Sequence, residues 1–140
     1  MPIRKASARW EGTLQEGNGT IHTGLGEGSY TFKSRFEEGP GTNPEELIGA
    51  AHAACFSMAL SGKLTNAGFP PTSVETTANV HLDKTDAGMT VTKIDLVSDA
   101  TVPGLDKDEF DKLAADAKAT CPISRLLSPG AEITLQATLS

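Results

Sequence analysis

Cysteine is scarce in this sequence. Two of the 140 residues are cysteines, Cys55 and Cys121, and no Cys-x-x-Cys or His-x-x-x-His pair occurs. Structural zinc sites need four such ligands, so the spacing excludes the common zinc-binding modules. Without a secretory context, a structural disulfide between the two cysteines is not expected either.

An excess of positive charge is also absent. Twelve Lys and Arg residues stand against eighteen Asp and Glu residues, which gives a net charge of −6. A non-specific nucleic-acid binder needs a basic face, and docking on anionic lipid needs clustered Lys and Arg. We therefore expect neither nucleic acid nor a membrane among the partners.

The chain lacks a long apolar run and an apolar leader. Its longest apolar stretch, residues 47–60, is interrupted by His52 and Ser57 and is shorter than the roughly 20 residues that a bilayer requires. The first residues carry charges but no apolar segment typical of a signal peptide. We expect a cytoplasmic protein, in which a cysteine pair is more often catalytic or metal-binding than structural.

The length fits one domain, predicted over residues 1–140, because no repeat, low-complexity tract or linker interrupts it. Alternating apolar and polar residues predict strands at residues 6–10, 30–36, 74–82, 89–102 and 133–139. Asn18-Gly19 predicts a hairpin turn, and a change of parity near Thr92 predicts a β-bulge. Strands, helix, strands, helix and strand in this order predict an α+β fold with antiparallel sheets.

One long helix is predicted after Asn43. Asn43 is a good N-cap, Pro44 suits the first helical position, and Glu46 has capping-box spacing. The residues from there to Leu64 are apolar nearly all round the helix, and Gly68 ends it. A monomer of this size can hardly surround a helix of about 30 Å. The pattern therefore favours a partner subunit.

A second helix is predicted from Asp106, with Glu109 completing another capping box. Its apolar stripe ends at Cys121, and Pro122 follows immediately. If Pro122 opens a short helix, Cys121 stands at its N-terminus. Free N–H groups and the helix dipole stabilise a thiolate there and lower its pKa.

Cys55 is predicted in the middle of the long helix, where burial raises the pKa of a thiol. A reactive Cys55 therefore needs a cation, and Arg35, Arg125 and His52 are the candidates. His52 also permits a Cys–His nucleophile for acyl transfer, although a histidine on a buried helix is more often a core residue. Both cysteines could equally be inert, since free cysteine is among the most buried residue types.

Two segments resemble one known family. The first is Gly41 to Leu60, which includes Ala51-His52-Ala53-Ala54-Cys55-Phe56, and the second is Cys121-Pro122-Ile123-Ser124. In their order and distance they resemble the OsmC/Ohr hydroperoxide peroxidases, the family of osmotically inducible protein C. The likeness extends to Trp10-Glu11-Gly12 and Ser34-Arg35-Phe36.

This resemblance implies a fold and a chemistry. The implied fold is an α+β intertwined homodimer, in which antiparallel β-sheets wrap two long central helices and the active sites lie at the subunit interface. The implied activity is reduction of organic hydroperoxides without metal, haem or another cofactor; hydrogen peroxide as a substrate is left open. Cys55 would be oxidised to a sulfenic acid, and Cys121 would resolve it as an intramolecular disulfide. A lipoylated protein or another dithiol would be the reductant.

Arg35 and Glu45 complete the set of site residues that the resemblance implies. Arg35 would hold Cys55 as a thiolate, and Glu45 would orient Arg35 through a bidentate pair. Glu45 and Cys55 are ten residues apart, which separates them by about 15 Å along one helix. We therefore predict that Arg35 and Glu45 of one chain serve Cys55 of the other. A thiol-based redox sensor or binding module without fast turnover is the alternative.

Overall fold

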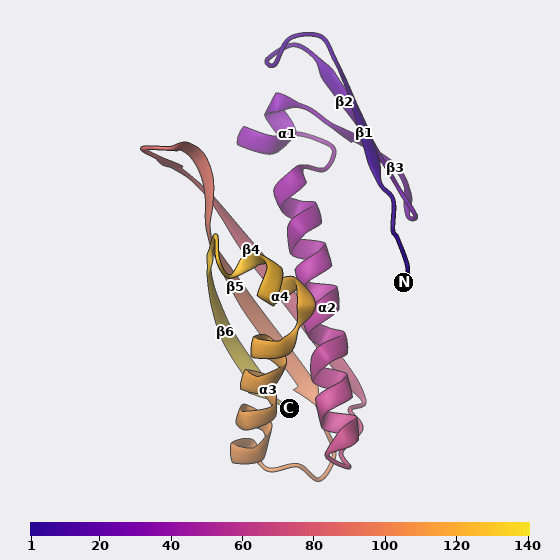
Figure 1. Ribbon diagram of the computed structural model, residues 1–140, viewed down its shortest axis with the longest axis vertical. Coiled ribbons are helices and arrows are strands. Elements are labelled where there is room, and N and C mark those ends of the chain that lie inside the picture. The colour runs from indigo at the N-terminus through magenta and orange to yellow at the C-terminus, as the bar shows by residue number, and fades with distance from the viewer. The chain divides into compact units, whose positions relative to one another are not determined.

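The computed structural model describes all 140 residues, which form two compact units, residues 1–47 and 48–140. Each unit contains one three-stranded sheet, and the strand labels of Figure 1 follow the chain order. Helices and strands together confirm the predicted α+β class. The organisation of residues 1–140 as one domain stays a prediction.

The first unit is built on an antiparallel sheet in the order β1-β2-β3. Its elements are β1 (Ser7–Glu11), β2 (Asn18–Thr23), β3 (Gly26–Tyr30), α1 (Phe32–Phe36) and the beginning of α2 (Pro44–Asn66). Ile21 of β2 is the large apolar side chain that this sheet buries. The strand predicted at residues 6–10 is confirmed as β1.

The turn predicted at Asn18-Gly19 is wrong. Both residues belong to β2, paired with Glu11 and Trp10 of β1. The turn lies just before them and is closed by a hydrogen bond from the Gly17 N–H to the Thr13 carbonyl at 2.8 Å. Gly19 is needed for packing and not for a turn, because it lets the Tyr30 ring lie against the strand. A Cβ atom at this position would lie 2.3 Å from that ring.

The strand predicted over residues 30–36 is also wrong beyond Tyr30. Thr31 and Ser34 form a capping box that begins α1. The Thr31 hydroxyl accepts the Ser34 N–H at 3.1 Å, and the Ser34 hydroxyl accepts the Thr31 N–H at 2.8 Å. These local hydrogen bonds outweigh the alternation of aromatic residues and place Arg35 on a helical turn.

The long helix α2 has the ends that the sequence predicts. Asn43 caps it by accepting the Glu46 N–H at 2.8 Å, and Gly68 beyond its end has a positive φ of 93°. One face is buried, with His52, Phe56, Leu60 and Leu64 at intervals of four residues.

The second unit is built on a sheet in the order β4-β5-β6. Its elements are the rest of α2, β4 (Ser73–Thr85), β5 (Gly88–Thr101), α3 (Lys107–Thr120), α4 (Pro122–Leu127) and β6 (Glu132–Leu139). The antiparallel pair β4–β5 contains the predicted bulge: His81 pairs with Lys93 and Leu82 with Val91, which leaves Thr92 between them.

The prediction of antiparallel sheets is wrong for the last strand. β6 pairs with β5 in parallel, with Leu135 opposite Leu96. Two parallel strands need a long crossover, usually helical. α3 and α4 form this crossover, and α3 packs along β6 (Figure 1). The second sheet is therefore mixed.

The core of the second unit lies between its sheet and its helices. It combines the buried face of α2 with the inner residues of β5 and the apolar stripe of α3. Its fully buried large side chains include Phe56, Leu60, Leu64, Ile94, Leu96 and Phe110. Cys121 belongs to the same cluster, so the core itself positions this sulfur.

The opposite face of α2 is apolar and uncovered in the single chain. Ala50, Ala54 and Met58 are exposed, Met58 to 78%. By length and composition alone α2 is long and apolar enough to cross a membrane, and 28% of its most apolar 18-residue segment is buried. The core helix of a soluble protein can have the same length and composition. The absence of a membrane-spanning segment stays a prediction.

Candidate active site

The two cysteines meet in the second unit. The sulfur atoms of Cys55 on α2 and Cys121 between α3 and α4 lie 3.0 Å apart. Both are free thiols; Cys55 is partly exposed, whereas Cys121 is fully buried. A disulfide requires the sulfurs to approach to about 2.05 Å. The geometry suits reversible bonding, with Cys55 as the sulfur that a solute reaches more easily.

The Cys121-Pro122 dipeptide explains why the second sulfur faces α2. A residue before proline avoids helical backbone angles, and Cys121 accordingly has φ −55° and ψ 122°. This extended residue ends α3 and begins α4, as the sequence predicts. The bend between the two helices leaves Cys121 at the end of the buried stripe of α3.

The two thiols differ in acidity. Burial, followed by the hydrogen bond with Cys121, raises the pKa of Cys55. Burial alone would raise the pKa of Cys121 as well, but its interactions with Cys55, with Ser124 and with the Ile123 backbone together lower it. The Cys121 side chain makes no capping hydrogen bond at the start of α4. No cation is among the groups that shift the pKa of Cys55, although an opposite charge nearby would favour its thiolate.

His52 does not form a Cys–His pair. Its Nε2 atom lies 2.7 Å from the Ser124 hydroxyl, and its buried Nδ1 has no partner. Burial lowers the pKa of His52 and favours the neutral ring. Ser124 itself is buried on α4. Sequence reasoning missed it as a site residue, because 72 positions separate the two partners.

Arg35 and Glu45 form a bidentate pair in the first unit. The Glu45 Oε1 atom accepts from Arg35 Nη2 at 2.8 Å and from Nε at 3.2 Å, while Oε2 lies 3.3 Å from Nε. The Arg35 side chain is 38% exposed and the Glu45 side chain 11%. The Phe36 ring lies 5.2 Å from the guanidinium carbon. Arginine has five N–H donors, so this pair leaves donors of Arg35 for a third group.

Short polar bonds hold this pair in place. The Asn43 amide donates to the Ser34 carbonyl at 3.0 Å, which ties α1 to the N-terminus of α2. The Ser34 hydroxyl donates to the Thr42 carbonyl at 2.8 Å. Arg35 and Glu45 thus stand on backbone that is fixed on both sides.

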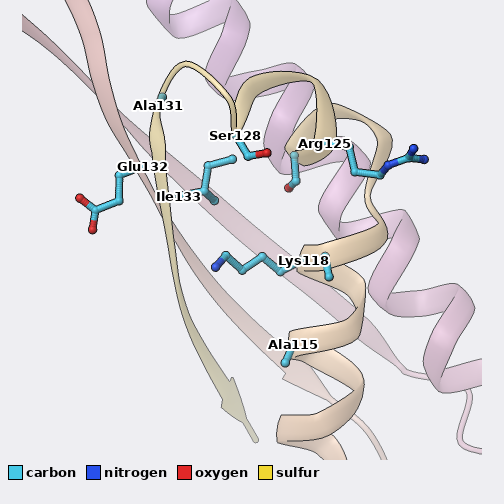
Figure 2. Close-up of a pocket in the computed structure, with 9 residues that line it drawn as sticks. Ala115, Lys118, Arg125, Ser128, Ala131, Glu132 and Ile133 are labelled. Atoms are coloured by element: carbon cyan, nitrogen blue, oxygen red, sulfur yellow. The ribbon is translucent and has the colours of Figure 1, made fainter.

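A hollow of about 380 Å³ lies between α3, α4 and the beginning of β6. Ser124 and the third candidate cation, Arg125, are among its lining residues, but neither cysteine is. Figure 2 shows Lys118 extending toward β6 and the Arg125 guanidinium pointing the opposite way. The hollow therefore does not hold the sulfur pair. The structure contains no group of three or more His, Cys, Asp or Glu residues that could bind a metal.

The chain is similar to curated proteins over most of its length. It is 56% identical over 135 residues to peroxiredoxin OsmC of Escherichia coli (strain K12), covering 94% of this chain and 93% of that protein. It is 33% identical over 97 residues to organic hydroperoxide resistance protein OhrA of Bacillus subtilis (strain 168), covering 68% of this chain and 66% of that protein.

Solved structures and a family model agree with these relatives. The fold matches an organic hydroperoxide resistance protein OsmC from Legionella pneumophila with a TM-score of 0.72, 26% identity and 99% coverage of both chains. It matches an OsmC-like protein from Mycoplasma pneumoniae with a TM-score of 0.74 at 15% identity, covering 99% of this chain and 97% of that one. The model of OsmC-like proteins matches residues 37–136. The chain therefore belongs to the OsmC-like protein family.

Proposed function

We propose that this protein is a cysteine-dependent peroxidase that reduces organic hydroperoxides. Its relatives are named peroxiredoxin and organic hydroperoxide resistance protein, which supports a peroxidase-type role. The observation that carries the proposal is the distance of 3.0 Å between the sulfurs of Cys55 and Cys121. Two inert core cysteines would not need to meet across 66 positions of sequence.

The first step takes place at Cys55. Its thiolate attacks the distal oxygen of the hydroperoxide, the O–O bond breaks, and the alkoxide takes up a proton and leaves as the alcohol. Cys55 becomes a sulfenic acid. The partial exposure of Cys55 supports this assignment, because the fully buried Cys121 is less accessible to a substrate.

The second step joins the two sulfurs. Cys121 attacks the sulfenic sulfur of Cys55, the S–O bond breaks, and hydroxide takes up a proton and leaves as water. The result is an intramolecular disulfide, which an external dithiol must reduce by exchange. A lipoyl-type dithiol is the reductant class that the proposal takes from the family resemblance, and no bound cofactor takes part. The proposed setting is the cytoplasm.

The charge that Cys55 lacks is proposed to come from a second copy of the chain. Glu45 and Cys55 both belong to the continuous helix α2, and ten residues of α-helix span about 15 Å. The bidentate Arg35–Glu45 pair is therefore proposed to serve Cys55 of the partner chain instead of Cys55 of its own helix. The uncovered face of α2 at Ala50, Ala54 and Met58 supports a homodimer, because such apolar surface favours burial.

Steady-state turnover tests the function. We expect the reduced protein to consume an excess of tert-butyl hydroperoxide with dihydrolipoamide as the dithiol, and the Cys55→Ser variant to lose this activity. A single oxidation without multiple turnover would instead favour the redox-sensor alternative. Equal activity of wild type and Cys55→Ser would contradict the assignment of Cys55.

A further inference from the structure

His52 is a buried polar residue that the proposed peroxide chemistry does not use. It lies on α2 three residues before Cys55, is 0% exposed, and contacts Ser124 of α4. Ser124 in turn is the third residue after Cys121, at the start of α4. The Ser124 side chain is among the groups that lower the pKa of Cys121, so His52 on α2 and the second sulfur have Ser124 as a common neighbour.

The hydrogen bonds indicate which nitrogen of His52 carries the proton. Burial favours a neutral ring, which has one N–H. A proton on Nδ1 would be a buried donor without an acceptor, whereas a proton on Nε2 has the Ser124 oxygen at 2.7 Å. Buried donors are nearly always paired, so the Nε2–H form is favoured. The Ser124 hydroxyl then accepts from His52, and its own hydrogen points elsewhere.

We propose that His52 is a positioning residue for the resolving step: by donating to Ser124, it keeps the Ser124 hydroxyl hydrogen available to the Cys121 sulfur. This inference rests on the proposed function, in which Cys121 attacks the sulfenic acid of Cys55. Only the thiolate attacks, so a donor that is held toward Cys121 increases the reactive fraction. His52 touches neither sulfur in this scheme and acts through Ser124.

The groups around Cys121 make its thiolate a specific reporter of this effect. Cys55 is the titratable group in contact with it, at 3.0 Å, and the other groups that lower its pKa are the neutral Ser124 and the Ile123 backbone. In a Cys55→Ser background, the thiolate absorbance then reports Cys121 alone, since the chain has no other cysteine. The pH dependence of this absorbance gives the pKa of Cys121, and comparing it with and without His52 measures the influence of His52 on that pKa.

Three variants test the proposal. His52→Leu removes the donor at similar volume, Ser124→Ala removes the hydroxyl, and His52→Gln keeps an N–H that can reach Ser124. We expect the leucine and alanine variants to raise the Cys121 pKa. In otherwise wild-type protein, we expect them to slow disulfide formation about tenfold after one equivalent of tert-butyl hydroperoxide, the loss expected for one hydrogen bond to a charged group.

His52→Gln should stay close to wild type, and the double variant His52→Leu/Ser124→Ala should lose no more than Ser124→Ala alone. Additive losses, an unchanged Cys121 pH profile in folded His52→Leu, or a nitrogen-15 spectrum with the proton on Nδ1 would overturn the proposal. Failure of the proposed function would look different: wild-type protein would then form no disulfide with the hydroperoxide at all.

Discussion

The sulfur atoms of Cys55 and Cys121 lie 3.0 Å apart, although 66 positions of sequence separate the residues. The contact is produced by two features of the chain. Cys55 lies on α2 next to Phe56, which is fully buried in the core. Cys121 lies at the bend that Pro122 imposes between α3 and α4. The pair is thus part of the core rather than of a surface loop, which favours a fixed approach of the two thiols.

Cys121→Ser separates the two steps of the proposed reaction. The variant should still oxidise once at Cys55, because attack on the hydroperoxide does not involve Cys121. It should then stall as a sulfenic acid, which a sulfenic-acid trapping reagent followed by mass spectrometry detects. Multiple turnovers with a dithiol at the wild-type rate would argue against a resolving role for Cys121.

Arg35→Ala should raise the pKa of Cys55 in the assembled protein, because an opposite charge favours the ionised thiol. Since burial already raises the pKa of Cys55 in the single chain, alkylation of Cys55 near neutral pH should slow by about tenfold or more. Alkylation rates are measured across pH in a Cys121→Ser background. Lys33→Ala, a neighbouring exposed cation on α1, is the matched control. An identical pH profile with and without Arg35 would contradict its role.

Mixed dimers test whether Arg35 acts across the subunits. A heterodimer of one Arg35→Ala chain and one Cys55→Ser chain has one intact site if the arginine comes from the partner, and no intact site if it comes from the same chain. We expect about half of the wild-type activity per dimer. Activity no greater than that of the two parent variants would show that each chain uses its own arginine.

Met58→Glu should disrupt the proposed homodimer. Met58 is 78% exposed in the single chain, so the change should leave the fold of the chain intact. At an interface, however, a charge on each α2 would lose water and weaken association by roughly two orders of magnitude or more. Sedimentation equilibrium measures the dissociation constant. Val97→Glu, on the exposed side of β5, is the control; equal dimerisation of both variants would contradict an interface at Met58.

Asp95 should make the free energy of unfolding decrease as the pH becomes acidic. Hydrogen bonds from Thr134 and His81 lower its pKa to about 2. Because the folded-state value lies below the unfolded value, ionised Asp95 stabilises the fold above about pH 4, and this contribution is lost as the pH falls through about 2. Asp95→Asn should lower the urea midpoint at neutral pH, and the difference from wild type should shrink on acidification. Asp86→Asn, in the exposed β4–β5 turn, is the control.

Capping residues and the alternation of apolar residues predicted the helices and strands whose limits depend on neighbouring residues in the sequence. The caps at Asn43 and Asp106 begin α2 and α3, and the change of parity at Thr92 is a bulge. The predictions were wrong where a residue distant in sequence determines the local structure. Gly19 is small because the Tyr30 ring lies over it, not because it turns the chain.

The contacts within the candidate site were predictable in part. The cysteine pair and the Arg35–Glu45 pair followed from a resemblance between motifs, and both pairs are in contact in the structure. The parallel pairing of β6 and the bond between His52 and Ser124 were not predictable. Neither leaves a periodic or local signal, because each joins segments that only the folded chain brings together.

Titration of the two thiols with a hydroperoxide tests the central claim most directly. The reduced protein contains two free cysteines per chain, and one equivalent of tert-butyl hydroperoxide should remove both together. Non-reducing peptide mapping should then find Cys55 joined to Cys121 within one chain. Two thiols that persist in the presence of excess hydroperoxide would contradict the account.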